Sequence, residues 1–130
     1  MNGNEIVLDT NQAIDVLNNR ADTGTWIAGF ERVYFPVPVV GELRFGALNS
    51  KRAEENLRHV ERLVARCTTL DVTAATAEVY ARIRLELKQS GAPIPENDLW
   101  IAATCIQHNL PLASSDEHFR LVPGLQLVPR

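Results

Sequence analysis

Short apolar runs rich in β-branched residues alternate along this chain with longer segments of helical periodicity, and this alternation limits the fold more than any other feature. The runs predict strands at residues 5–8, 33–35, 68–72, 110–113 and 125–128. The intervals predict helices at residues 11–18, 23–30, 38 to about 46–49, 51–66, 73–90, 96–108 and, as a short turn, 116–120. Strands that alternate with helices form a mainly parallel sheet covered on both faces, so we expect an α/β fold.

The length and composition of the chain are those of one globular domain. It has 130 residues, of which 45% are hydrophobic and 22% are charged. No repeat, low-complexity tract or linker divides it, so we expect a single domain over residues 1–130. Acidic residues at Glu5, Asp9 and Asp15 argue against a signal peptide, and no apolar run is long enough for a membrane span. We therefore expect a cytoplasmic protein with no membrane partner.

Cysteine, histidine and net charge narrow the possible functions. Cys67 and Cys105 lie in apolar stretches and outside any CxxC pair, which argues against a disulfide scaffold or a structural zinc site. His59, His108 and His118 share no ligand spacing, so we interpret each as a surface or loop residue; His118 is the one near the candidate site described next. The formal net charge of −3 lacks the positive field typical of nucleic-acid-binding domains.

Four carboxylates stand out by position. Asp9 directly follows the first predicted strand, and Asp116 comes shortly after the fourth. In sheets of this kind ligands bind beyond the carboxyl ends of the strands, where the strand order reverses. Glu42 and Asp98 each lie in an otherwise apolar helical stretch, where a lone carboxylate is costly unless something compensates it.

If these carboxylates converge, their chemistry indicates a metal site. Carboxylates gathered in one pocket repel each other and take up protons unless a cation is present. Mg²⁺ and Mn²⁺ are hard cations that suit carboxylate oxygens, and such sites keep waters and accept phosphate oxygens. One or two such metals activate a water and neutralise charge at a scissile phosphate. Our hypothesis is therefore a divalent-metal site for phosphate chemistry, formed by Asp9, Glu42, Asp98 and Asp116.

Each of these acids also has a purely structural explanation, which the sequence leaves open. Asp9 and Asp116 are suitable helix N-caps, and Asp98 lies where a helix begins. For Glu42 the alternative is an ion pair with one of two arginines, Arg32 or Arg44.

Four segments in the same order as these acids resemble the motifs of PIN-domain ribonucleases, and most of all the VapC-type toxins of bacterial and archaeal toxin–antitoxin pairs. The segments are Val7-Leu8-Asp9-Thr10-Asn11, residues 39–46 (VVGELRFG), residues 97–103 (NDLWIAA) and residues 113–119 (ASSDEHF). Each motif is weak alone, but four in the right order in a chain of this length are a strong signal. The likeness extends from the first predicted strand to Val128.

The resemblance implies a three-layer α/β/α sandwich in which the first and fourth strands are neighbours. It implies an endoribonuclease dependent on Mg²⁺ or Mn²⁺, in which Asp9, Glu42 and Asp98 hold the main metal directly or through water. Asp116 would complete the pocket or bind a second metal. Since Glu117 is a second acid beside Asp116, the sequence leaves open which of the two faces the metal.

Two more positions match places where the family carries a small polar residue that supports the site. These are Asn11 and Ser114. The family more often has threonine at the second position, and serine keeps the hydroxyl group. We therefore expect Ser114 to retain the supporting role.

A cluster of basic residues in the middle third offers a rim for the RNA backbone, with Arg44, Lys51 and Arg52 as candidates. The structural alternative is a solvated helix face, in which neighbouring glutamates pair with these residues. Leaving the four candidate metal-site acids out changes the formal net charge from −3 to +1. We therefore expect RNA binding of modest salt dependence.

The resemblance also implies partners: an RNA substrate, a cognate antitoxin that covers the site, and a second copy of the chain in a homodimer. Apolar residues of the early helices are candidates for an antitoxin groove, with core packing as the alternative: Ile14, Leu17, Trp26, Ile27 and Phe45. Two other functions remain open at this point. One is a non-catalytic PIN-like binding module, and the other is a structure-specific nuclease in RNA maturation.

Overall fold

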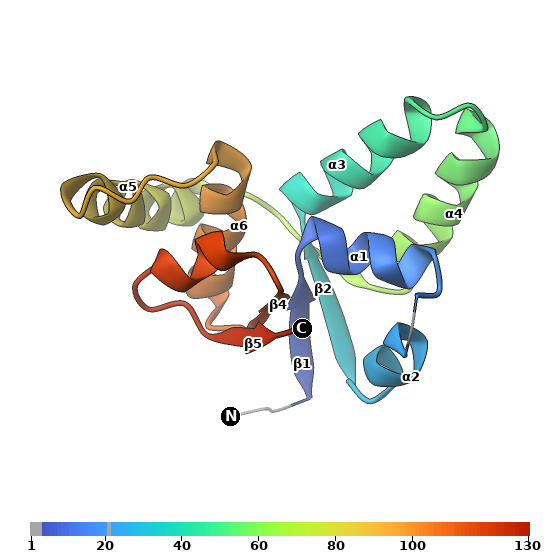
Figure 1. Ribbon diagram of the computed structural model, residues 1–130, viewed down its shortest axis with the longest axis horizontal. Coiled ribbons are helices and arrows are strands. Elements are labelled where there is room, and N and C mark those ends of the chain that lie inside the picture. Colours follow the sequence, from blue (N-terminus) through green and yellow to red (C-terminus); the bar gives the residue numbers. More distant parts are fainter. Residues whose placement is uncertain (1–3, 21) are drawn as a thin grey trace.

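The structure is a computed structural model that describes residues 4–20 and 22–130 (Figure 1). Its strands form one parallel sheet in the order β3-β2-β1-β4-β5. The bounds are Glu5–Leu8 for β1, Arg32–Pro36 for β2, Thr68–Leu70 for β3, Leu112–Ser114 for β4 and Leu127–Pro129 for β5. The expected parallel sheet and the pairing of the first with the fourth strand are confirmed.

Helices cover both faces of this sheet. They are α1 (Thr10–Leu17), α2 (Thr23–Ala28), α3 (Val37–Leu48), α4 (Ala53–Ala65), α5 (Ala74–Gln89) and α6 (Glu96–His108), with the 3₁₀ turn η1 (Glu117–Leu121) between β4 and β5. The chain moves outward from β1 to β3 through α1–α4 and then returns to β4 through α5 and α6. Because parallel crossovers are right-handed, this reversal places the two groups of helices on opposite faces (Figure 1). The expected three-layer α/β/α fold is confirmed.

The core lies along β1 and the middle of α6. Ile6, Val7 and Leu8 are fully buried, because β1 has neighbouring strands on both sides and helices on both faces. Residues 101–105 of α6 are all buried against the sheet. The two cysteines are free, and Cys105 belongs to this core.

Element boundaries differ from the sequence predictions by only a few residues, but two of the differences affect the site. The strand β4 begins at Leu112 rather than residue 110, since Pro111 precedes it, and it ends at Ser114, which therefore belongs to the strand. Helix α1 begins at Thr10, one residue earlier than predicted, so Asp9 is its N-cap. In the part of the chain that the structure describes, no helix combines the length and apolar character needed to cross a membrane.

Candidate active site

The candidate site lies at the carboxyl ends of β1 and β4, where the strand order reverses. These strands are hydrogen-bonded neighbours, with Val7 opposite Leu112 and Leu8 opposite Ala113. Asp9 is the first residue after β1, and Asp116 comes two residues after the end of β4. The parallel register therefore brings two acids that are far apart in the sequence to the same edge of the sheet.

Asp9 is the buried acid of the site, with only 4% of its surface exposed. Its Oδ1 accepts a hydrogen bond from the Gln12 backbone N–H at 2.9 Å, and its Oδ2 accepts one from the Ser114 hydroxyl. Burial raises the pKa of Asp9, the two hydrogen bonds oppose this, and the negative charge of Asp116 adds to it. The capping explanation is therefore correct, and the same carboxylate also faces Ser114 and Asp116.

Ser114 connects the two acids of the strand ends. While it donates to Asp9, its Oγ accepts the Asp116 backbone N–H at 3.0 Å, and the side chain is buried. Asn11, the other residue expected to support the site, is exposed on α1, and its side chain forms no hydrogen bond with any described residue. The structure thus brings Ser114 into the site and leaves Asn11 at its edge.

Glu42 enters the site from α3. Its Oε1 accepts a hydrogen bond at 2.8 Å from the hydroxyl of Thr10, the residue that follows Asp9. Arg44 pairs with Glu61 at 3.4 Å, and among the described residues neither Arg32 nor Arg44 forms an ion pair with Glu42. The ion-pair alternative is therefore not what the structure shows. Thr10 is a site residue that the sequence reasoning missed, although its place beside Asp9 in the first motif was a usable signal.

Asp98 lies in the first turn of α6, with 19% of its side chain exposed. Burial raises its pKa, the negative charges of Asp116 and Glu42 raise it further, and His118 opposes them. This electrostatic coupling links Asp98 to acids from both β4 and α3. Together with the contacts of Asp9, it places the four predicted carboxylates at the same edge of the sheet, with Asp98 and Asp116 in the tightest group.

His118 was interpreted from the sequence as a surface or loop residue, and it is indeed about half exposed. However, its ring Nδ1 lies 3.3 Å from Asp98 Oδ2 and 3.0 Å from Asp116 Oδ1. Its backbone N–H also donates to Asp116 Oδ1 at 3.0 Å, which caps η1. The adjacent Glu117 instead pairs with Arg120 at 3.0 Å on the surface, so Asp116 is the acid of this pair that faces the site.

The donor set of this site fits a divalent cation. Ligand atoms of Asp98, Asp116 and His118 lie within 4.8 Å of one another. Two of the four acids have raised pKa values because burial and mutual repulsion disfavour their charged forms, and a bound cation relieves both. Carboxylate oxygens are the donors that Mg²⁺ and Mn²⁺ prefer.

Comparison with known proteins identifies the fold family. The PIN domain family model matches residues 6–125. The chain belongs to the PIN-domain family. Ribonuclease VapC4 of Mycobacterium tuberculosis is 30% identical to it over 132 residues, covering 98% of each chain, and ribonuclease VapC2 of Rickettsia felis is 29% identical, covering 93% of this chain and 94% of the relative.

Comparison with solved structures also indicates a likeness to VapC proteins. VapBC2 from Rickettsia felis bound to a DNA fragment from its promoter superposes with a TM-score of 0.88 at 27% identity, covering 97% of this chain and 98% of that one. VapBC-1 from nontypeable Haemophilus influenzae has a TM-score of 0.88 at 28% identity, covering 96% and 97%. This PIN domain therefore resembles VapC ribonucleases of toxin–antitoxin complexes over nearly its whole length.

The basic residues predicted to contact RNA lie on the α3–α4 arm of the PIN domain, which consists of α3, α4 and the turn between them. Arg44 pairs with Glu61 at 3.4 Å, and Arg52 approaches Glu55 at 3.9 Å. Lys51 and Arg52 lie in the turn between the two helices, at the end of the arm away from the sheet (Figure 1). These pairs match the solvated-face explanation for Arg44 and Arg52, and a role in RNA binding stays a prediction.

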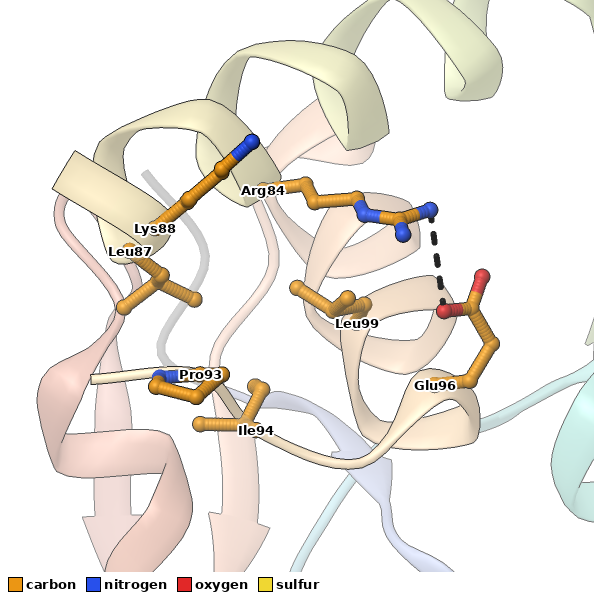
Figure 2. Close-up of a pocket in the computed structure, with 7 residues that line it drawn as sticks. All are labelled: Arg84, Leu87, Lys88, Pro93, Ile94, Glu96 and Leu99. Carbon is orange, nitrogen blue, oxygen red and sulfur yellow. Dashed lines mark ion pairs between the residues drawn. The ribbon is translucent and has the colours of Figure 1, made fainter. Parts of the chain in front are cut away.

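The PIN domain has cavities outside the acidic cluster. One of about 370 Å³ lies between α5 and α6, where Arg84 and Glu96 pair at 3.9 Å beside it (Figure 2). None of the four site acids lines it, so the chemistry favours the acidic cluster over this larger cavity as the active site. A second cavity of about 260 Å³ lies among α1, α3 and α4 and is lined in part by Ile14, Leu17 and Leu43.

Proposed function

We propose that this PIN domain is a divalent-metal-dependent endoribonuclease and the toxin of a toxin–antitoxin pair. The observation that supports this most is the convergence of Asp9, Glu42, Asp98 and Asp116 at the strand-order reversal of a PIN fold. Relatives that are named VapC ribonucleases support RNA as the substrate. The proposed metal is Mg²⁺ or Mn²⁺, with Asp9, Glu42 and Asp98 as its holders and Asp116 as the fourth acid.

In this proposal the chain's own groups position charge rather than react covalently. A bound divalent cation supplies an activated water and neutralises charge that develops at the scissile phosphate. Gln12 and Ser114 fix both oxygens of Asp9, so this carboxylate is oriented before any ligand arrives. Thr10 orients Glu42 in the same way from the adjacent position. Hydrogen bonds of this kind set the orientation of metal-binding carboxylates and the affinity with which they bind the metal.

The central test is the loss of RNA cleavage in two conservative variants, Asp9→Asn and Asp98→Asn. Each removes a negative charge at nearly constant shape, so we expect cleavage of total RNA in Mg²⁺ or Mn²⁺ to disappear while circular dichroism stays that of the folded protein. Asp71→Asn removes an exposed carboxylate on the β3–α5 connection and should cleave like wild type. Wild-type rates in both site variants would refute the assignment, and end mapping of the wild-type products would identify the cut site.

We further propose that the antitoxin docks on the groove formed by α1, α3 and α4. Ile14, which lines the cavity of about 260 Å³ together with Leu17 and Leu43, is 38% exposed, so part of the apolar lining is open to a partner. Phe45 and Leu48 of α3 are 68% and 59% exposed but lie outside this lining. Trp26 and Ile27, which the sequence also suggested for this groove, pack against the core instead. Solved relatives in this family are VapBC complexes, which supports a protein partner.

This docking proposal is tested with Ile14→Glu, which puts a charge into the apolar groove outside the acidic site. We expect the variant to cleave RNA like wild type but to escape neutralisation when antitoxin is co-expressed. Val72→Glu changes an apolar residue that is 42% exposed elsewhere and should remain neutralised. Full neutralisation of Ile14→Glu would exclude the groove. Light scattering of the protein without antitoxin measures its molar mass and so tests the proposed homodimer.

A further inference from the structure

The contacts of His118 give the acidic site a nitrogen donor. Its Nδ1 lies 3.0 Å from Asp116 Oδ1 and 3.3 Å from Asp98 Oδ2, so one ring atom approaches carboxylates from both β4 and α6. The backbone of His118 is also anchored to Asp116, because its N–H donates to Asp116 Oδ1 at 3.0 Å. The η1 cap thus keeps the base of the His118 side chain beside this carboxylate.

The spacing of these atoms matches neighbouring positions around a metal ion. Metal–ligand bonds of about 2.0–2.2 Å place two adjacent ligands of an octahedral ion about 3 Å apart. The two distances from Nδ1 are close to this value. In the His118 tautomer that carries its proton on Nε2, the Nδ1 lone pair is available to a cation.

The chemistry of this donor bears on which metal the site takes. Mg²⁺ is a hard cation that binds oxygen and keeps its waters, whereas imidazole suits transition metals. A site of carboxylates alone distinguishes Mg²⁺ from Mn²⁺ weakly. A site that adds an imidazole to the carboxylates of Asp98 and Asp116 favours Mn²⁺ over Mg²⁺, because both cations accept carboxylate oxygen and Mn²⁺, a transition metal, also accepts nitrogen.

We propose that His118 is a direct metal ligand and that its imidazole makes this PIN domain selective for Mn²⁺ over Mg²⁺. The inference rests on the proposed function, since it assumes that the acidic cluster binds a divalent cation. It adds to that function a ligand and a metal preference. The alternative role for His118 is only a hydrogen-bond bridge between Asp98 and Asp116.

Direct observation of the metal tests this proposal without any activity assay. Pulsed electron paramagnetic resonance detects nitrogen bound to Mn²⁺, and calorimetry with MnCl₂ and with MgCl₂ measures both affinities. The full chain, freed of any antitoxin, is compared with His118→Asn, His118→Gln and His108→Asn. His108 is an exposed residue at the far end of α6 and serves as the matched histidine control.

We expect nitrogen coupling in wild type and in His108→Asn, and none in either His118 variant. In those variants Mn²⁺ affinity should fall about tenfold or more, and Mg²⁺ affinity should change by less than about threefold. Persistent nitrogen coupling in both His118 variants, or unchanged Mn²⁺ affinity, would overturn the proposal.

Asp98→Asn in the same experiment separates this proposal from the proposed function. If Asp98→Asn loses Mn²⁺ binding while both His118 variants bind as wild type does, His118 is only a bridge and the metal site stands. If Asp98→Asn also binds Mn²⁺ like wild type, the acidic cluster is not the metal site and both proposals fail.

Discussion

At the scale of single residues, hydroxyl groups keep the acids of the site in place. Ser114 donates to the buried Asp9 and accepts from the backbone of Asp116, and Thr10 donates to Glu42. A buried carboxylate without such donors is costly, because desolvation favours its neutral form. Small polar residues beside the acids are therefore as much a part of the site as the acids themselves.

Ser114→Ala tests this directly. The change leaves Asp9 Oδ2 without its hydroxyl donor and the Asp116 N–H without its acceptor, so we expect the free energy of unfolding to fall by about 1–3 kcal/mol in urea denaturation at neutral pH. RNA cleavage should fall by about 10–100-fold. Ser114→Thr keeps a hydroxyl group and should retain most of the stability and most of the RNA cleavage of the wild type. A fully stable Ser114→Ala protein would contradict this role.

The raised pKa of Asp9 predicts a pH dependence for the metal-free protein. Between the ordinary carboxyl pKa near 3.8 and the raised value, the native state binds more protons than the unfolded state. The contribution of Asp9 to the free energy of unfolding therefore falls as pH rises through that interval. Above the interval, this loss of stability is complete. Asp9→Asn does not titrate, so its stability relative to wild type should increase from about pH 4 to pH 7 in EDTA. A pH-independent difference would contradict the burial of a charged Asp9.

At the scale of elements, the ends of strands and helices position the chemistry. β1 passes directly into α1 at Asp9, α6 begins two residues before Asp98, and η1 begins just after Asp116. The last strand, β5, is held to the rest of the fold by a side-chain contact next to its end. Arg130, next to the end of β5, pairs with Asp22 at 2.9 Å, and its guanidinium lies 4.2 Å from the centre of the Trp26 ring. This contact connects the end of the sheet to α2.

Arg130→Ala should therefore lower the free energy of unfolding by about 1 kcal/mol, because it removes a cation–π contact and an ion pair on a side chain that is only 21% exposed. Arg130→Lys keeps the charge without the planar stacking and should have an intermediate effect. Arg52→Ala removes an exposed pair at 3.9 Å and is the control, with little expected change. Equal effects of Arg130→Ala and Arg52→Ala in urea denaturation would contradict the contact's importance.

At the scale of the whole molecule, the fold concentrates negative charge at one edge of the sheet. The chain has 16 acids, and four of them meet at the sheet edge between the α3–α4 arm and the α5–α6 pair (Figure 1). Like charges held together oppose folding. The metal-free fold should therefore be less stable than its apolar core alone would allow, and a bound cation should restore the difference.

Metal addition should accordingly raise the melting temperature. At about 100 times the dissociation constant, a ligand that binds only the native state adds about 2.7 kcal/mol, which corresponds to a shift of several degrees for a domain of this size. Differential scanning fluorimetry with MnCl₂ should show this shift in wild type and not in Asp98→Asn. A wild-type melting temperature that does not respond to Mn²⁺ or Mg²⁺ would count against the metal site.

The sequence predicted most of the fold because hydrophobic periodicity is local. The continuous apolar run at 6–8 indicates a strand buried on both faces, and the bounds of α6 agree with the prediction residue for residue. The small errors lie at strand ends, where hydrogen bonding to a neighbour decides the limits. Ser114 was placed after its strand, but it pairs with Pro129 of β5 and so belongs to β4.

The sequence by itself determined which residue types carry the chemistry: acids after strands and acids within apolar helices. Only the tertiary structure decided which side chains meet, because contacts such as that of Ser114 with Asp9, 105 positions apart, depend on strand register and helix placement. Ser114 reaches Asp9, Thr10 reaches Glu42, and His118 reaches Asp98 and Asp116. Asn11 is exposed at the edge of the site, and Glu117 pairs with Arg120 instead. Periodicity assigns a residue to a face of its own element, and the packing of elements gives that face its partners.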